Sequence, residues 1–104
     1  MRQYVVVVLP DAEQAILEQA EFIAADKPDA ATRWLERLWD AIEDLSRFPN
    51  RNAIAPAESD AIGTPVRKLV FGAYLVFYRV REDEALVEVM RFRHGARRAE
   101  AEES

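Results

Sequence analysis

The sequence contains no cysteine, one histidine and three glycines among its 104 residues. Without cysteine the chain can form neither disulfides nor thiolate metal sites, and this composition fits a reducing cytoplasm. One histidine gives no support for a zinc or iron site, and three glycines cannot build a phosphate-binding loop. The three serines, Ser46, Ser59 and Ser104, have no histidine near them in the sequence, so a catalytic triad is unsupported. The sequence therefore predicts no metal and no cofactor.

Long apolar runs are also absent. The run at the start, Tyr4–Leu9, has six residues and is too short for the apolar core of a signal peptide or for a membrane span. We interpret it as part of a first strand, Gln3–Leu9. Because every position from Val5 to Leu9 is apolar, we expect this strand to be covered on both faces and to lie in the interior of the sheet.

Two helices are predicted in the first half of the chain. The first begins at Pro10 and Asp11, because proline fits a first helical turn and an acidic residue there complements the helix dipole. Its apolar positions are Ala12, Ile16, Ala20 and Ile23, with Ala15 and Phe22 alongside. The second helix starts near Pro28 and ends at Pro49-Asn50. Its apolar side chains recur every three to four positions, and its two tryptophans are interpreted as core residues.

The segment Arg51–Pro65 contains two prolines and one glycine and is predicted to be a surface loop. Three strands are predicted after it, with turns at Phe71-Gly72 and Glu82-Asp83: Val66–Val70, Ala73–Val80 and Ala85–Arg93. Strict alternation in the last strand divides its residues between two faces: Val87, Val89, Arg91 and Arg93 on one, and Leu86, Glu88, Met90, Phe92 and His94 on the other. Both faces begin apolar, so alternation alone does not identify the face that the helices cover.

Length and pattern together predict a single domain over residues 1–98, followed by a short acidic and disordered tail at 99–104. The net charge of the chain is −5, which argues against a nucleic-acid binder, but the charge is unevenly distributed. Asp11–Arg47 carries ten acidic and four basic residues, whereas Val66–Arg98 carries eight basic and four acidic residues. The basic segment could attract an anionic partner locally.

The basic side chains gather on the predicted strands and after the last of them. Clustered arginines with one histidine can hold a phosphodiester and supply a general acid or base. They can equally dock an acidic peptide, or form a solvated edge that discourages strand pairing. The residues alone leave these three interpretations open. The cluster comprises Arg67, Lys68, Arg79, Arg91, Arg93, His94, Arg97 and Arg98.

The motifs of the chain, taken in order, resemble the RelE/ParE superfamily of toxins from bacterial type II toxin–antitoxin systems. The resemblance covers nearly the whole chain and favours the ParE-like branch. It is carried by Leu9-Pro10-Asp-Ala12, Pro28-Asp-Ala-Ala31, Leu45-Ser-Arg-Phe-Pro49, Val66-Arg67-Lys-Leu69, Gly72-Ala-Tyr74-Leu-Val-Phe-Tyr78-Arg-Val80 and Arg93-His94-Gly-Ala-Arg97.

This resemblance implies an α+β fold in which two helices pack on a small, mostly antiparallel sheet of about four strands, in the order β-α-α-β-β-β. It also implies a cytoplasmic growth inhibitor without a cofactor, neutralised by a cognate antitoxin that wraps around it. RelE-like members cut mRNA in the ribosomal A site without a metal. ParE-like members inhibit DNA gyrase instead.

One position departs from the superfamily pattern. Many members carry an arginine after the tyrosine of the central strand, but Leu75 follows Tyr74 here. We therefore favour a ParE-like toxin that binds a protein target, DNA gyrase, and keep two alternatives. One is a RelE-like mRNA endonuclease, with Arg67, Arg93 and His94 as candidate catalytic residues. The other is an inactive member that only binds its antitoxin. The residues assigned to target or antitoxin binding are Arg79, Arg91, Arg97 and Arg98.

Overall fold

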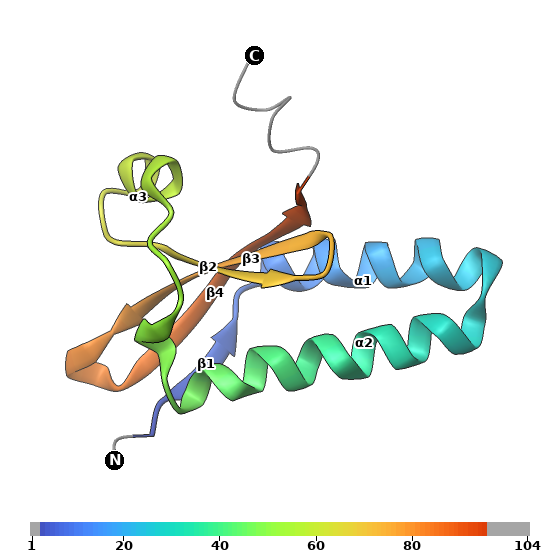
Figure 1. Cartoon of the computed structure of the whole chain (residues 1–104), viewed down its shortest axis with the longest axis horizontal. Coiled ribbons are helices and arrows are strands. Elements are labelled where there is room, and N and C mark those ends of the chain that lie inside the picture. The colour runs from blue at the N-terminus through green and yellow to red at the C-terminus, as the bar shows by residue number, and fades with distance from the viewer. Residues whose placement is uncertain (1–2, 96–104) are drawn as a thin grey trace.

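The structure, a computed structural model, describes residues 3–95. Three helices accompany a four-stranded sheet (Figure 1), which confirms the α+β class and the predicted order, with one helix added. The elements are β1 (Val5–Val8), α1 (Pro10–Asp26), α2 (Pro28–Glu43), α3 (Pro56–Ile62), β2 (Arg67–Phe71), β3 (Tyr74–Arg81) and β4 (Leu86–His94). The predicted acidic tail at 99–104 lies outside the described residues.

The strands follow the order β1-β4-β3-β2, with β1 parallel to β4 and the other neighbours antiparallel. The prediction of an interior, doubly covered first strand was wrong, because β1 forms one edge of the sheet. Val6 and Val8 pack against the core, whereas the side chain of Val5 is 65% exposed on the other face. A run of valines fits either environment, since the residue type is favoured in strands generally.

The helices α1 and α2 form a hairpin that packs on one face of the sheet (Figure 1). Lys27 alone separates them, and each helix begins with a proline in its first turn, as the sequence predicted. Trp34 and Trp39 pack against the core, as predicted. The buried residues of this core are Ala12, Ile16, Leu38, Ile42, Leu45, Val76, Tyr78, Val87, Val89 and Phe92.

Two predictions about the helices need correction. The second helix ends at Glu43 rather than at Pro49, because the chain tightens into a 3-10 turn over Asp44–Ser46 that keeps Leu45 buried. The predicted loop 51–65 contains α3. Ser59 supports this short helix through its hydroxyl, which donates to the Ala55 carbonyl at 2.7 Å and accepts from the Val66 amide at 2.8 Å. Gly63 then ends it in the left-handed conformation, with φ of 88°.

A β-bulge in β4 changes which side chains share a face. Phe77 pairs with Arg91 and Tyr78 pairs with Val89, so Met90 is the extra residue between them. From that point the alternation is inverted. Phe92 joins Val87 and Val89 in the core beneath the helices, while Arg91 turns to the opposite face. The predicted grouping of Val87 and Val89 with Arg91 and Arg93 was therefore wrong.

Candidate functional site

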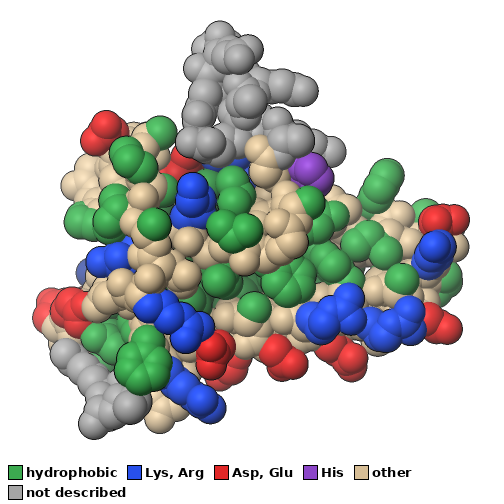
Figure 2. All heavy atoms as spheres, in the orientation of Figure 1, with side chains coloured by type: hydrophobic (Ala, Val, Ile, Leu, Met, Phe, Trp, Pro, Cys, Tyr) green, Lys and Arg blue, Asp and Glu red, His purple; other side chains and the backbone are tan. Residues whose placement is uncertain are grey.

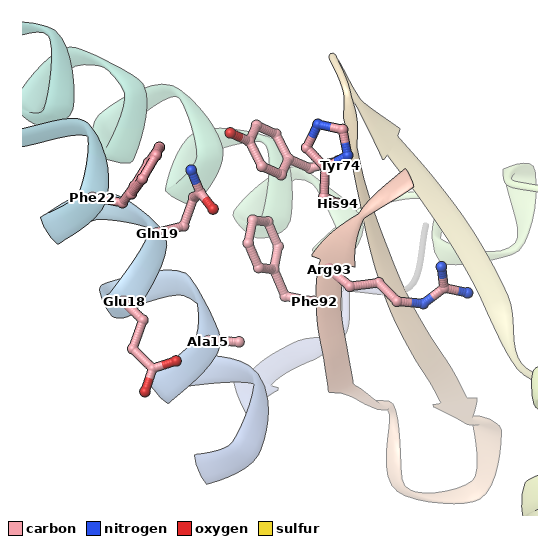
Figure 3. Close-up of a pocket in the computed structure, with 8 residues that line it drawn as sticks. All are labelled: Ala15, Glu18, Gln19, Phe22, Tyr74, Phe92, Arg93 and His94. Carbon is pink, nitrogen blue, oxygen red and sulfur yellow. The ribbon is translucent and has the colours of Figure 1, made fainter. Parts of the chain in front are cut away.

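The candidate site is the C-terminal end of β4, where two neighbouring side chains lie on opposite faces of the sheet. His94 lies beside Tyr74 on the side of β4 that carries the helices, whereas the side chain of Arg93 points to the other side (Figure 3). Gly95 closes the strand: its amide donates to the Ala73 carbonyl at 2.7 Å, and a Cβ at this position would lie 3.2 Å from the same oxygen. A glycine is therefore well suited to hold His94 at the end of the ladder, opposite Tyr74.

On the helical side, a groove of about 480 Å³ separates α1 from the ends of β3 and β4 (Figure 3). Its sheet wall is mostly aromatic and also includes Arg93. The ring of Tyr74 stacks on Phe92 with centroids 5.3 Å apart, and His94 meets Tyr74 edge-on, also at 5.3 Å. Its helical wall is formed by Ala15, Glu18, Gln19 and Phe22.

Phe22 is the most exposed apolar side chain of this groove. The sequence placed it only alongside the apolar face of the first helix, and in the structure it is 75% exposed. A large aromatic side chain that gains no burial within its own domain is a common component of a binding surface. The groove therefore offers an apolar wall and an exposed aromatic side chain to a partner.

On the opposite face, two arginines of β4 converge on one carboxylate of α3. Arg91 Nη1 lies 3.0 Å from Glu58 Oε2, and Arg93 Nη2 lies 3.5 Å from Glu58 Oε1. The guanidinium of Arg93 also lies 4.7 Å from the ring centroid of Phe77, a cation–π contact. The side chains of Arg93 and Glu58 are partly buried, with 12% and 15% of their surfaces exposed. Both arginines are thus held by a carboxylate of the same chain.

Arg79, another predicted binding residue, has a carboxylate partner as well. Its Nε lies 2.6 Å from Glu88 Oε1, and Arg81 contacts the same oxygen at 3.6 Å. Arg97 and Arg98 lie outside the described residues. The arginines predicted to bind a target are therefore, where the structure describes them, neutralised by neighbouring acidic residues.

Arg67 lies at the other end of the sheet, under the segment that precedes α3. Its Nη1 donates to the Asn52 carbonyl at 2.6 Å, and the Asn52 amide donates to the Tyr78 hydroxyl at 3.0 Å. That hydroxyl donates in turn to the Pro49 carbonyl at 2.5 Å. Burial raises the pKa of Tyr78, partly offset by the Asn52 hydrogen bond. Arg67 is thus committed to a buried polar network.

The structure does not bring the three candidate catalytic residues together. Arg67 pairs with Tyr78 in the sheet, whereas His94 pairs with Tyr74, four residues away along β3. At about 3.3 Å per residue this separation is about 13 Å. Arg93 lies near His94 in sequence but on the opposite face. Within residues 3–95, no group of histidine and acidic side chains is placed to hold a metal ion.

Sequence reasoning did not identify Glu58, Glu88, Gln19 or Phe22 as parts of this site. Glu58 is 33 residues from Arg91 in the chain, and no local pattern pairs residues at such a separation. The β-bulge had no glycine or proline to mark it. The strand alternation in the sequence did contain one useful signal for the site, because it already assigned Arg93 and His94 to opposite faces of the sheet.

No helix within the described part of the chain combines the length and the apolar character that crossing a membrane requires.

Comparisons with known proteins identify the family of the chain. The family model described as the ParE toxin of the type II toxin–antitoxin system parDE matches residues 6–99. Among curated protein sequences, none matches this chain.

Two solved structures share the fold. The chromosomal ParDE toxin–antitoxin system from P. aeruginosa aligns with a TM-score of 0.72 at 15% identity, covering 88% of this chain and 96% of that one. The RelBE2 toxin–antitoxin complex from Mycobacterium tuberculosis aligns with a TM-score of 0.58 at 21% identity, covering 90% and 93%. At such identities these likenesses concern the fold alone, whereas the family match covers most of the sequence. The chain therefore belongs to the ParE toxin family of type II toxin–antitoxin systems, within the predicted RelE/ParE superfamily.

Proposed function

We propose that this toxin inhibits growth in the cytoplasm by docking on a protein target, DNA gyrase, and that a cognate antitoxin holds it inactive. The observation that carries this proposal is the groove beside α1, where Phe22 is exposed next to the aromatic wall formed by Tyr74 and Phe92. Apolar and aromatic side chains grouped in this way favour a protein partner, because such side chains supply most of the energy of protein interfaces.

The charges of the molecule support the same proposal. Arg79, Arg91 and Arg93 are paired with carboxylates of the chain itself, so they present little unbalanced positive charge to a phosphate backbone. Basic and acidic side chains also lie close together along the α2 side of the face in Figure 2. With a net charge of −5, the chain lacks the strong positive field that draws proteins to ribosomal RNA.

The alternative function is ribosome-dependent cleavage of mRNA without a metal. One observation favours it: His94 and Tyr74 line the same groove and their rings are in contact. A histidine at this place could donate or accept a proton during phosphodiester cleavage. Arg93 also lines this groove, but its guanidinium is directed to the other face, where it lies 3.5 Å from Glu58. Arg67 pairs with Tyr78 farther along the sheet, so neither guanidinium points toward a phosphate bound beside His94.

The deciding experiment is pulse-labelling of DNA and protein synthesis after the chain is produced alone in a bacterium. We expect DNA synthesis to fall first while protein synthesis continues, and purified chain to inhibit supercoiling by purified gyrase. An early fall in protein synthesis with intact replication would instead establish the endonuclease. Normal growth with folded chain present would identify an inactive member that only binds its antitoxin.

Two serine substitutions on α1 locate the docking surface. Phe22→Ser removes the exposed aromatic of the groove, and we expect gyrase inhibition to require about thirtyfold more protein, as for the loss of an interface hot spot. Leu17→Ser is the matched control, since Leu17 is an exposed apolar residue of the same helix that does not line the groove. Equal effects of the two variants would contradict the assigned surface.

A further inference from the structure

The helix α3 lies on the face of the sheet opposite α1 and α2, yet none of its own residues is buried. Figure 1 shows it standing apart from the helical hairpin. Its attachment to β4 is the carboxylate of Glu58, which contacts Arg91 at 3.0 Å and Arg93 at 3.5 Å. The Ser59 hydroxyl adds an uncharged attachment, since it accepts from the Val66 amide at 2.8 Å just before β2. Because apolar packing contributes little to the contact with β4, the strength of that contact depends on charge.

The two arginines form an organised receptor for a carboxylate. The guanidinium of Arg93 packs on the ring of Phe77, and its side chain is only 12% exposed. The side chain of Arg91 is 58% exposed. Two guanidinium groups that converge on one carboxylate form charge-assisted hydrogen bonds, which are stronger than neutral ones. Glu58 therefore occupies the place that an acidic side chain of another protein could take.

Apolar surface continues from this receptor. A cavity of about 400 Å³ lies between α3, the start of α1 and β4. Most of its lining is apolar, although Asp11 of α1 adds a carboxylate and Arg91 a guanidinium. The apolar lining includes Ala61, Ile62, Phe77, Met90 and Phe92. A ligand that presents a carboxylate to the arginines would place its neighbouring atoms in this cavity. Apolar walls suit an aliphatic side chain better than a sugar or a phosphate.

We propose that α3 is a lid over a binding site for an acidic peptide segment, and that Glu58 imitates the acidic residue of the partner. The occupant is a segment of a partner protein in which a glutamate or aspartate adjoins a large aliphatic residue. This inference deepens the proposed function, because it rests on the chain acting through protein interfaces. It states that the ligand of Arg91 and Arg93 is a carboxylate, and that the carboxylate of the partner displaces the carboxylate of Glu58.

Competition between Glu58 and the partner has a measurable consequence. A site that is open only part of the time binds with an affinity reduced by the open fraction. Removing the charge of Glu58 weakens the lid and raises that fraction. Glu58 makes two ion pairs. At about two- to threefold each, they change the opening equilibrium by about five- to tenfold together, so the affinity for an acidic segment rises by a similar factor.

The test uses the purified full chain and a short capped peptide of glutamate and leucine, labelled for fluorescence anisotropy. We expect Glu58→Gln to bind this peptide about five- to tenfold more tightly than the unaltered chain. The same peptide with glutamine in place of glutamate should bind both proteins weakly. Asp60→Asn is the matched control, because Asp60 is an exposed acidic residue of the same helix. It should change the affinity less than twofold.

The arginine side of the receptor is tested in the same assay. Arg91→Ala, added to Glu58→Gln, should abolish the gain in affinity. Arg81→Ala is its control, since Arg81 is an exposed arginine of β3 whose carboxylate contacts are Glu84 and Glu88 rather than Glu58. A gain that survives Arg91→Ala, or that Arg81→Ala removes equally, would overturn the proposal.

Hydrogen exchange of the unaltered chain provides a test that does not depend on any variant folding. The amide of Val66 donates to the Ser59 hydroxyl of α3 at 2.8 Å, and so reports on whether α3 stays attached next to β2. Adding the glutamate–leucine peptide should speed the exchange of this amide, because the lid opens when the peptide binds. Unchanged or slower exchange at saturating peptide would overturn the lid.

Two further results would contradict the proposal. An equal gain in Asp60→Asn would mean that overall charge, rather than the receptor, controls binding. Tighter binding of a short single-stranded RNA than of the acidic peptide by Glu58→Gln would make the site a nucleic-acid site. None of these measurements involves gyrase or growth, so they succeed or fail independently of the proposed target.

Discussion

At the scale of single residues, the hydroxyl of Tyr78 is a well-defined polar group in an otherwise apolar core. It donates to the Pro49 carbonyl and accepts from Asn52, and Asn52 is held in turn by Arg67. These hydrogen bonds attach the 49–52 segment to the sheet, and this segment precedes α3 in the chain. Its residues therefore affect the stability of the fold rather than the chemistry of a bound phosphate.

Replacing Tyr78 by phenylalanine should cost about 1–2 kcal/mol of unfolding free energy near neutral pH, because Asn52 and Pro49 lose a buried partner. Burial raises the pKa of Tyr78 above 10.0 in the folded chain. Its stabilisation is therefore fully present below about pH 10 and lost as the pH rises through the raised pKa. Urea titrations at several pH values should show the two proteins converging above about pH 10. Parallel stability curves would contradict this assignment.

Arg67→Ala should lower the free energy of unfolding by about 1.5–3 kcal/mol, the usual range for a hydrogen bond from a charged donor. Lys68→Ala, one residue further along β2, serves as control, and its effect should stay within about 0.5 kcal/mol. Growth inhibition by Arg67→Ala should fall only in proportion to the folded protein that remains. Complete loss of inhibition in a fully folded variant would instead favour a catalytic role.

At the scale of elements, β1 differs between its two faces although its four residues are all valine. Val5 faces solvent, whereas Val6 packs against the core beneath the helices. Val5→Lys should therefore cost less than about 1 kcal/mol, and Val6→Lys about 3 kcal/mol or more, because the second change places a charge against the core. Thermal unfolding of the pair provides the measurement. Equal losses would mean that both faces of this strand are covered.

The existence and order of β1, α1, α2 and the last three strands could be predicted because each leaves a local pattern in the sequence. Proline positions marked both helix starts, and apolar spacing identified the packed face of α2. The edge position of β1 could not be predicted, because pairing with β4 is a contact between distant segments. The bulge at Met90 was equally hidden, since that residue has no backbone preference that marks an insertion.

The candidate site was predictable only in part. Alternation separates Arg93 from His94, and the end of the last strand was identified as the place to examine. The helix α3 and the capture of two arginines by Glu58 depend on a tertiary contact between residues more than thirty positions apart. The groove beside α1 depends on Phe22 remaining outside the core, which the periodicity of its helix did not indicate.

At the scale of the whole molecule, the two faces of the sheet offer different chemistry. One carries the aromatic groove, and the other carries arginines neutralised by acidic residues. A partner that wraps around the chain could use both faces at once. We therefore expect a cognate antitoxin to bind over a larger surface than a single groove would allow.

Binding of that antitoxin should stabilise the toxin by mass action. A short reading frame adjoining this one in the genome should encode it. At a hundredfold excess over the dissociation constant, the stabilisation is about 2.7 kcal/mol, or about ten degrees or more in the unfolding midpoint of a domain of this size. Differential scanning calorimetry with and without the purified neighbouring product provides the measurement. An unchanged midpoint would contradict the assignment of that product as partner.

The parallel pairing of β1 with β4 also determines when the sheet can be completed during synthesis of the chain. The first strand finds its partner in the last one, so a nascent chain cannot complete the sheet until residues 86–94 have left the ribosome. Arg91, Arg93 and His94 belong to that same final strand. A chain that stops before β4 would therefore lack both the pairing partner of β1 and the arginines that contact Glu58.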